Sequence, residues 1–238
     1  KVTLGEIAGG LEATMTGSAR EAAKSRSVAL AEEKQAQRAA WDRRLAERWD
    51  MRPMSVERMM TELAGTLPPD TLLADDSITS REALNGAFKF EEPGSIFGED
   101  GGAIGWGIGG AMGLKLAHPD RPVVGIVGDG TSMMTVQGLW TAANMNIPVV
   151  YVVCNNGAYR IIKLSMNNYK RQVLKEESPS SRYIGMDFSL PLNLAGMAEA
   201  IGLHGRRIED PAELVPAVRE ALALGKPAVL DVVIDGSL

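Results

Sequence analysis

The sequence has 238 residues, of which 45% are hydrophobic and 23% are charged, and its formal net charge at pH 7 is −5. This length allows one large domain or two small ones, and the acidic balance gives no indication of nucleic-acid binding. No apolar run approaches the roughly 18 residues of a membrane span, no signal-like start is present, and a single cysteine excludes a disulfide framework, so we expect a cytoplasmic globular protein.

Residues 18–50 are rich in Ala, Glu, Arg and Lys and contain neither Gly nor Pro, which predicts a long helix. Its few large apolar residues make a thin stripe without a persistent heptad, so a surface or linker helix is favoured over a coiled coil. The first residue is Lys1 rather than methionine. We therefore expect a fragment or a processed chain.

Ordered structure is expected to resume at Pro53, with Ser55 capping a helix that runs to about Gly65. A short strand is predicted from Thr71 to Ala74. Five polar residues follow this strand: Asp75, Asp76, Ser77, Thr79 and Ser80. Polar side chains at the carboxyl end of a parallel strand face the ligand crevice. These residues could equally cap the next helix.

A dense glycine cluster follows at residues 98–113 and contains a G-x-G-x-x-G at Gly105, Gly107 and Gly110. A dinucleotide fingerprint should come directly after a buried strand. Here the preceding segment, Ser95 to Phe97, is short, and residues 98–104 intervene before the first glycine of the motif. The glycines are better suited to a helix packed closely on the sheet.

The stretch from Val123 to Ala158 carries the strongest pattern. Val123 to Val127 and Val149 to Cys154 are apolar runs typical of strands buried on both faces of a parallel sheet. Gly128-Asp129-Gly130 follows the first strand, and Asn155-Asn156 follows the second. Both polar groups should therefore face one crevice at the carboxyl edge of the sheet. Cys154 is expected to be a small core residue.

Asp129, Asn156 and a nearby backbone carbonyl would be hard oxygen donors, which favour Mg²⁺ or Ca²⁺. The flanking glycines let the backbone come close to a ligand, and the following hydroxyl residues open a helix whose amide groups attract phosphate. A diphosphate bridged to the protein by Mg²⁺ is the simplest interpretation, and two ordinary turns are the alternative. The flanking residues are Gly128, Gly130, Thr131 and Ser132.

GDG followed after 24 residues by NN resembles the signature of thiamine-diphosphate enzymes. The longer string LWTAANMNIPVVYVVCNNGAY is similar to the pyrophosphate-binding domain of the benzoylformate decarboxylase and acetohydroxyacid synthase group. The resemblance extends from about Met54 to the C-terminus. It implies an α/β fold with a doubly wound, mostly parallel sheet at residues 53–238, preceded at residues 1–52 by the end of a middle domain and a charged helical linker.

The resemblance also implies roles for particular residues. The Mg²⁺ ligands would be Asp129, the side chain of Asn156 and the carbonyl of Ala158. Thr79 and Ser80 would help to bind the diphosphate. The Gly102 carbonyl would accept a hydrogen bond from the cofactor's 4′-amino group, and Ile104 would be the apolar wedge that bends the cofactor, with plain core packing as the alternative for Ile104.

Gly157 to Lys163 is expected to start a helix that, by the resemblance, lines the substrate end of the site with Tyr159 and Ile162. Arg160 departs from the benzoylformate decarboxylase pattern, in which a glycine follows the tyrosine; it could steer a carboxylate or simply face solvent. Residues 165–183 are polar and are predicted to form a mobile flap or loop.

The remaining elements are predicted as two helices and two strands. Both histidines are expected at the surface, so no histidine-based catalytic or zinc site can be assembled. The helices are Pro191 to Ile201 and Pro211 to Leu224, the strands are Gly205 to Ile208 and Ala228 to Ile234, and the histidines are His118 and His204.

The resemblance implies a thiamine-diphosphate- and Mg²⁺-dependent decarboxylase or carboligase that acts on a small 2-oxo acid or aldehyde. The activating glutamate would come from a pyrimidine-binding domain, on upstream sequence or a partner chain, in a homodimer or homotetramer. An acetolactate-synthase-like carboligase is one alternative. A non-catalytic assembly subunit is another, and the presence of both Asp129 and Asn156 argues against it.

Overall fold

The computed structural model describes residues 2–98, 101–177 and 182–238. The chain divides into two compact units, up to Ala46 and from Glu47 onward. The first unit holds α1 (Val2–Thr14) and most of α2 (Gly17–Arg48). The sequence predicted α2 but not α1, which contains three glycines and so has low intrinsic helix propensity. Among the described residues, no helix is long and apolar enough to span a membrane.

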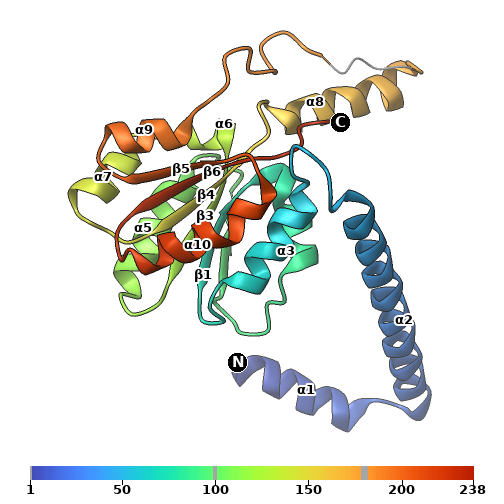
Figure 1. The fold of residues 1–238 in the computed structure, drawn as a ribbon. Helices are drawn as coiled ribbons and strands as arrows, with labels where there is room; N and C mark the ends of the chain where they lie inside the picture. Colours follow the sequence, from blue (N-terminus) through green and yellow to red (C-terminus); the bar gives the residue numbers. More distant parts are fainter. Residues whose placement is uncertain (1, 99–100, 178–181) are drawn as a thin grey trace. The chain divides into compact units, whose positions relative to one another are not determined.

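The second unit is built around a six-stranded parallel sheet with the strand order β2-β1-β3-β4-β6-β5 (Figure 1). The central strands β3 and β4 are buried along their whole length, as their apolar sequences predicted. The strands are β1 (Leu72–Asp76), β2 (Ile96–Gly98), β3 (Val123–Gly128), β4 (Val150–Asn155), β5 (His204–Ile208) and β6 (Ala228–Val233).

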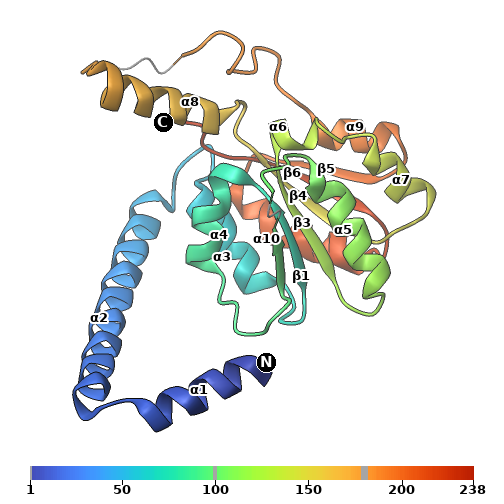
Figure 2. The same cartoon turned by 180° about the vertical axis from the view of Figure 1, so that it is seen from behind.

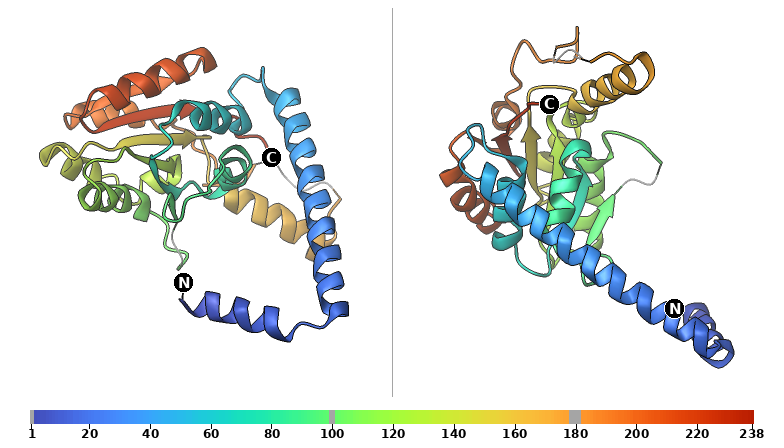
Figure 3. Two further views of the ribbon diagram at one scale, coloured as in Figure 1. Left: turned by 90° about the horizontal axis from the view of Figure 1, so that it is seen from below. Right: turned by 90° about the vertical axis from the view of Figure 1, so that its right-hand side faces the viewer.

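Helices cover both faces of this sheet, which confirms the predicted doubly wound α/β fold. One face carries α3 (Val56–Thr66), α4 (Arg81–Ala87) and α10 (Leu214–Ala223) (Figure 1). The other carries α5 (Trp106–Ala117), α7 (Gly138–Asn144) and α9 (Leu194–Ala200) (Figure 2). Seen from below, the sheet lies between these two helical layers (Figure 3).

One hydrophobic core cluster lies between the sheet and the layer formed by α5, α7 and α9. Tyr151 of β4 is buried there, and its hydroxyl donates to the Ile108 carbonyl of α5 at 3.2 Å. Cys154 is also buried, as predicted. The Ser55 hydroxyl accepts the Arg58 N–H at the start of α3, so the predicted N-cap is confirmed.

Several predicted elements differ from the structure at their boundaries. Asp75 and Asp76 lie inside β1 rather than after it, and α9 begins at Leu194 because Asn193 caps it by accepting the Gly196 N–H. The segment Pro211 to Leu224 is divided into the 3₁₀ helix η3 (Pro211–Glu213) and α10. His204 is half-buried rather than at the surface, whereas His118 is exposed as predicted.

The flap or loop predicted at residues 165–183 is wrong for residues 165–174, which are helical, whereas residues 175–177 and 182–183 are irregular. The structure has α8 (Arg160–Tyr169) followed by the π-helical turn η2 (Lys170–Leu174), and residues 178–181 lie outside the described residues. The polar composition was misleading because polar side chains form the buried face of this helix. Lys163 and Asn167, one helical turn apart, are both buried.

Candidate functional site

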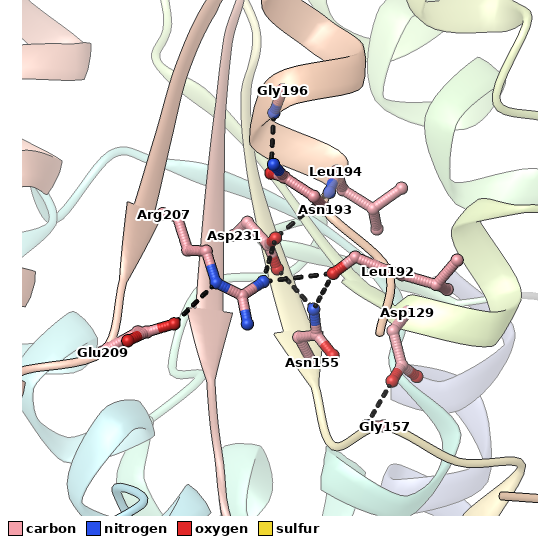
Figure 4. Close-up of polar contacts among 10 residues, drawn as sticks. All are labelled: Asp129, Asn155, Gly157, Leu192, Asn193, Leu194, Gly196, Arg207, Glu209 and Asp231. Atoms are coloured by element: carbon pink, nitrogen blue, oxygen red, sulfur yellow. Dashed lines mark hydrogen bonds and ion pairs between the residues drawn. The ribbon is translucent and has the colours of Figure 1, made fainter. Parts of the chain in front are cut away.

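The candidate site lies at the carboxyl edge of the sheet, where the loops after β3 and β4 meet. Asp129 follows β3 and is only 2% exposed. Its Oδ1 accepts the Gly130 N–H at 2.7 Å. Its Oδ2 accepts the Gly157 N–H, also at 2.7 Å (Figure 4). The two halves of the sequence motif are therefore in direct contact, as expected for neighbouring parallel strands. We call residues 128–130 the aspartate loop and residues 156–158 the asparagine loop.

Burial dominates the electrostatics of Asp129. Desolvation raises the pKa of its carboxyl to about 6, while backbone N–H groups of Gly130 and of the asparagine loop lower it. The carboxylate is thus only partly compensated by these dipoles. A cation at this position would supply the missing stabilisation.

The asparagine loop supplies oxygen donors of a different kind. The Asn156 Oδ1 accepts the Ala158 N–H at 3.1 Å, an Asx-type turn, and Gly157 has a φ of +69°, which favours glycine. Among the described residues, no group of three or more His, Cys, Asp or Glu could hold a metal ion. A metal here would therefore combine the Asp129 carboxylate with amide and carbonyl oxygens, a donor set that fits Mg²⁺ or Ca²⁺.

The glycines of the aspartate loop were predicted to let the backbone come close to a ligand. In the structure, an aromatic ring lies close to this backbone. A Cβ on Gly130 would lie 2.7 Å from Cε1 of Tyr159. That ring packs edge-to-face on Phe188, with 4.8 Å between the centroids. The candidate pocket residue Tyr159 is therefore beside Asp129, and Gly130 is needed for the contact.

The two residues after the aspartate loop do not start a helix of ordinary length. Thr131 and Ser132 belong to α6 (Asp129–Ser132), a single turn, and both are buried. The Ser132 hydroxyl donates to the Gly128 carbonyl at 2.8 Å, so it closes the loop on itself. Phosphate binding by Thr131 and Ser132 stays a prediction.

The hydroxyls after β1 lie on the 3₁₀ helix η1 (Ile78–Ser80). Ser80 is buried, and its hydrogen bond with the Cys154 thiol opposes the effect of burial on the pKa of that thiol. Thr79 is half-buried. Ile78 has a φ of +46°, a strained conformation for a β-branched residue of the kind found at functional sites.

The glycine loop before α5 is held from two sides. The buried Asp76 carboxylate accepts the N–H groups of Gly105 and Gly107 at 3.0 and 2.9 Å, and the Thr135 hydroxyl donates to the Gly105 carbonyl at 2.6 Å. Ile104 is 49% exposed. Core packing is therefore the wrong explanation for Ile104, and its role as a wedge stays a prediction, as does that of the Gly102 carbonyl.

The C-terminal residues pack against the asparagine loop. A Cβ on Gly236 would overlap the Asn156 carbonyl oxygen. Arg160 is half-buried and donates from Nε to the Ser237 carbonyl at 2.9 Å, so in this structure it binds the C-terminal segment, an arrangement that the sequence did not indicate. Ile162, the other pocket candidate, is exposed on α8.

Sequence reasoning missed two groups of polar residues near the site. Lys163 of α8 is buried and pairs with Asp187. Asp231 of β6 is buried and pairs with Arg207 of β5 at 2.9 Å. The signal for Asp231 was a lone charged residue in the apolar strand AVLDVV. Lys163 had no comparable signal, since lysine is common on exposed helices.

Comparison with known proteins identifies the family. The C-terminal TPP binding domain of thiamine pyrophosphate enzymes matches residues 79–232. Benzoylformate decarboxylase of Pseudomonas aeruginosa is 29% identical over 181 residues, which are 76% of this chain and 32% of that protein. The acetolactate synthase large subunit IlvG of Mycobacterium tuberculosis is 32% identical over 191 residues, 79% of this chain and 33% of that protein.

A solved structure agrees with these relatives. The thiamine diphosphate-dependent 4-hydroxybenzoylformate decarboxylase of Rhodococcus jostii RHA1 superposes with a TM-score of 0.68 at 26% identity, over 78% of this chain and 33% of that one. The chain spans about a third of the length of the curated relatives it matches. The family match, covering most of the second unit, shows that this chain belongs to the thiamine pyrophosphate (thiamine diphosphate) enzymes and contains their C-terminal cofactor-binding domain.

Proposed function

We propose that this chain is the C-terminal portion of a thiamine-diphosphate- and Mg²⁺-dependent 2-oxo-acid decarboxylase or carboligase resembling benzoylformate decarboxylase. The observation that carries the proposal is the contact between the Asp129 carboxylate and the Gly157 N–H at 2.7 Å. It brings a carboxylate and the asparagine loop together at the edge of the sheet where ligands bind.

In this proposal the protein's first task is to hold Mg²⁺ through Asp129, the Asn156 side chain and the Ala158 carbonyl. Mg²⁺ usually completes its octahedral shell with phosphate oxygens and water, so the metal would anchor a diphosphate. Thr79 and Ser80, from the turn after β1, would add hydrogen bonds to the same group.

The second task is to orient the organic part of the cofactor. When bound, thiamine diphosphate supplies a nucleophilic carbon and an electron sink for bond cleavage beside a carbonyl. The Gly102 carbonyl would accept a hydrogen bond from the aminopyrimidine, and the exposed Ile104 side chain would set the bend of the molecule. Tyr159 and Ile162 would border the space for a 2-oxo acid or aldehyde.

A complete site would also need a partner. Ile104, Met134 and Ile162 are large apolar residues on or near the site loops, and all three are exposed. A pyrimidine-binding domain, from upstream sequence or a second subunit of a homodimer or homotetramer, would cover them and bring the activating glutamate. This chain alone should therefore bind the cofactor weakly and give no turnover; full activity from it would contradict the need for that domain.

The metal assignment is tested by calorimetry on the complete protein that contains this chain. Asp129→Ala should abolish Mg²⁺-dependent binding of thiamine diphosphate, because it removes the charged ligand. Asp120→Ala, in the exposed turn before β3, is the matched control and should bind as the wild type does. Undiminished binding by Asp129→Ala would refute the assignment.

An acetolactate-synthase-like carboligase is the second candidate, favoured by relatives of that name at 32% identity or more. The two candidates differ in their products. The complete protein should release benzaldehyde from benzoylformate if it is a decarboxylase of that type. Formation of acetolactate from pyruvate, without benzaldehyde release, would favour the synthase.

A further inference from the structure

Asp231 is the centre of a hydrogen-bonded cluster beside the candidate site (Figure 4). Its side chain is fully buried on β6. The Oδ1 atom accepts from Nδ2 of Asn155 at 2.8 Å. The Oδ2 atom accepts from the Leu194 N–H at 3.1 Å and from Nη1 of Arg207 at 2.9 Å. Residues of β4, β5 and α9 thus converge on one carboxylate, which is saturated by charged and neutral donors.

This cluster fixes Asn155, the last residue of β4, in two ways. Its Nδ2 group also donates to the Leu192 carbonyl at 3.1 Å, and its own carbonyl accepts the Ile234 N–H at 2.9 Å. Hydrogen bonds therefore hold both the side chain and the backbone of Asn155 in place. The next residue is Asn156, so the asparagine loop starts from a fixed point.

The Asp231 carboxylate also holds residues 186–194, the segment that is hydrogen-bonded to the asparagine loop. Residues 186–188 bind the loop, since the Phe188 N–H donates to the Gly157 carbonyl at 2.9 Å. A few residues later, the Leu192 carbonyl accepts from Nη1 of Arg207 at 3.1 Å. The segment from 186 to 194 is thus held by the loop at one end and by the Asp231 cluster at the other.

We propose that Asp231 and Arg207 are positioning residues that set the geometry of the asparagine loop for metal binding. The inference rests on the proposed function, because it takes Asn156 and Ala158 as metal ligands. A buried ion pair could instead serve folding alone. The contact with Asn155, directly beside a ligand, points to the positioning role. Partners that hydrogen-bond a metal ligand directly change metal affinity by about 10-fold to 100-fold when they are removed. Asp231 acts one residue further from the ligand, through Asn155, so we expect a loss at the lower end of that range.

The first test compares two neighbouring arginines of β5. Arg207 pairs with Asp231, whereas Arg206 pairs with Glu220 at 2.9 Å, and their side chains are 30% and 31% exposed. In the complete protein with saturating thiamine diphosphate, Mn²⁺ binding is measured by electron paramagnetic resonance of the free ion. Arg207→Met should weaken Mn²⁺ binding about tenfold, whereas Arg206→Met should leave it unchanged. The midpoint of thermal unfolding is recorded for both.

The second test exchanges the side chains of Asp231 and Asn155, which are hydrogen-bonded to each other. Asp231→Asn brings two amides into contact, and Asn155→Asp brings two carboxylates together, so each should weaken Mn²⁺ binding. The double substitution should restore part of the affinity. The amide placed at position 231 can donate to the carboxylate at 155, and its oxygen still accepts from Leu194 and Arg207. The carboxylate at 155 cannot donate to the Leu192 carbonyl as the Asn155 amide does, so the rescue is incomplete.

The outcomes separate the inference from the proposed function. If Asp129→Ala abolishes Mn²⁺ binding but the Arg207, Asp231 and Asn155 variants bind as the wild type does, positioning is overturned and the metal site stands. Lower unfolding midpoints with unchanged affinity would show a purely structural cluster. Equal losses in Arg207→Met and Arg206→Met would also overturn the inference. If the wild type binds no Mn²⁺, both proposals fail.

Discussion

At the scale of single residues, the candidate site depends on one glycine that has no room for a side chain. Gly130 lies against the ring of Tyr159, and Phe188 packs edge-to-face with that ring and also lies close to Gly130. The contact joins the aspartate loop to the start of α8 without any polar group. Its geometry therefore sets where Asp129 lies relative to α8.

Gly130→Ala should destabilise the protein, since its Cβ would be 2.7 Å from Cε1 of Tyr159. Overpacking of this kind costs about 1–3 kcal/mol. Gly113→Ala is the matched control, because a Cβ there meets no atom within 4 Å on α5; it should stabilise the helix by about 0.5–1 kcal/mol. Urea unfolding monitored by circular dichroism measures both. Equal stability of the two variants would show that the ring moves freely.

Asp129 and Asn156 could be predicted as neighbours because the carboxyl ends of adjacent parallel strands must meet, whatever the intervening sequence. Asp231 could not be linked to Asn155 in the same way. Their contact depends on β6 lying beside β4, and the strand order is set by packing of the whole unit rather than by any local pattern. Arg207 shares this problem, because it reaches Asp231 from the edge strand.

At the scale of elements, α8 and the segment after it form one unit held by buried polar groups. Lys163 pairs with Asp187, the Tyr183 hydroxyl bonds the Asn167 side chain, and the Tyr159 N–H donates to the Met186 carbonyl. Such specific polar pairs have no periodic signature in a sequence. Composition alone therefore indicated a loop where the chain forms a helix with a polar buried face.

Asp187→Asn should loosen this unit, because it leaves the buried Lys163 ammonium without its carboxylate. Hydrogen exchange in residues 182–188 should become severalfold faster. Glu176→Gln, which breaks the more exposed pair with Lys170, should have little effect there. Unchanged exchange in the Asp187 variant would mean that the backbone contacts suffice.

The same pair has a defined pH dependence. The hydrogen bond from Lys163 holds the pKa of Asp187 below its ordinary value. A carboxyl whose pKa is lower in the folded state stabilises that state above its unfolded pKa. This stabilisation is lost as the pH falls through the lowered value. The protection of residues 182–188 should therefore decrease on acidification in the wild type but not in Asp187→Asn.

At the scale of the whole molecule, the site is assembled from segments far apart in the chain. The residues after β6 return to the start of the second unit, where Arg48 pairs with Asp235 at 3.0 Å and the Asp235 N–H donates to the Met54 carbonyl. Gly236 then packs on the asparagine loop. Continuous apolar runs predicted the central strands, but the contacts of the C-terminal residues follow only from the assembled fold.

The rate at which a thiol reagent labels Cys154 can report the opening of β4. Cys154 is buried in β4 directly before Asn155, and burial raises the pKa of its thiol to about 12. Labelling by a thiol reagent at pH 8 therefore requires the strand to open, after which the thiol regains a pKa of about 8.5. Mass spectrometry of the peptide containing Cys154 should show slow labelling in native protein and fast labelling in guanidinium.

A ligand that binds only the closed form reduces the open population. Mg²⁺ with thiamine diphosphate should therefore slow the labelling of Cys154 in the complete wild-type protein and have no effect on Asp129→Ala. Equal labelling with and without the ligands would contradict the proposed site. The buried thiol thus converts occupancy of the proposed metal site into a chemical labelling rate, which can be followed on unpurified mixtures and without knowing the substrate.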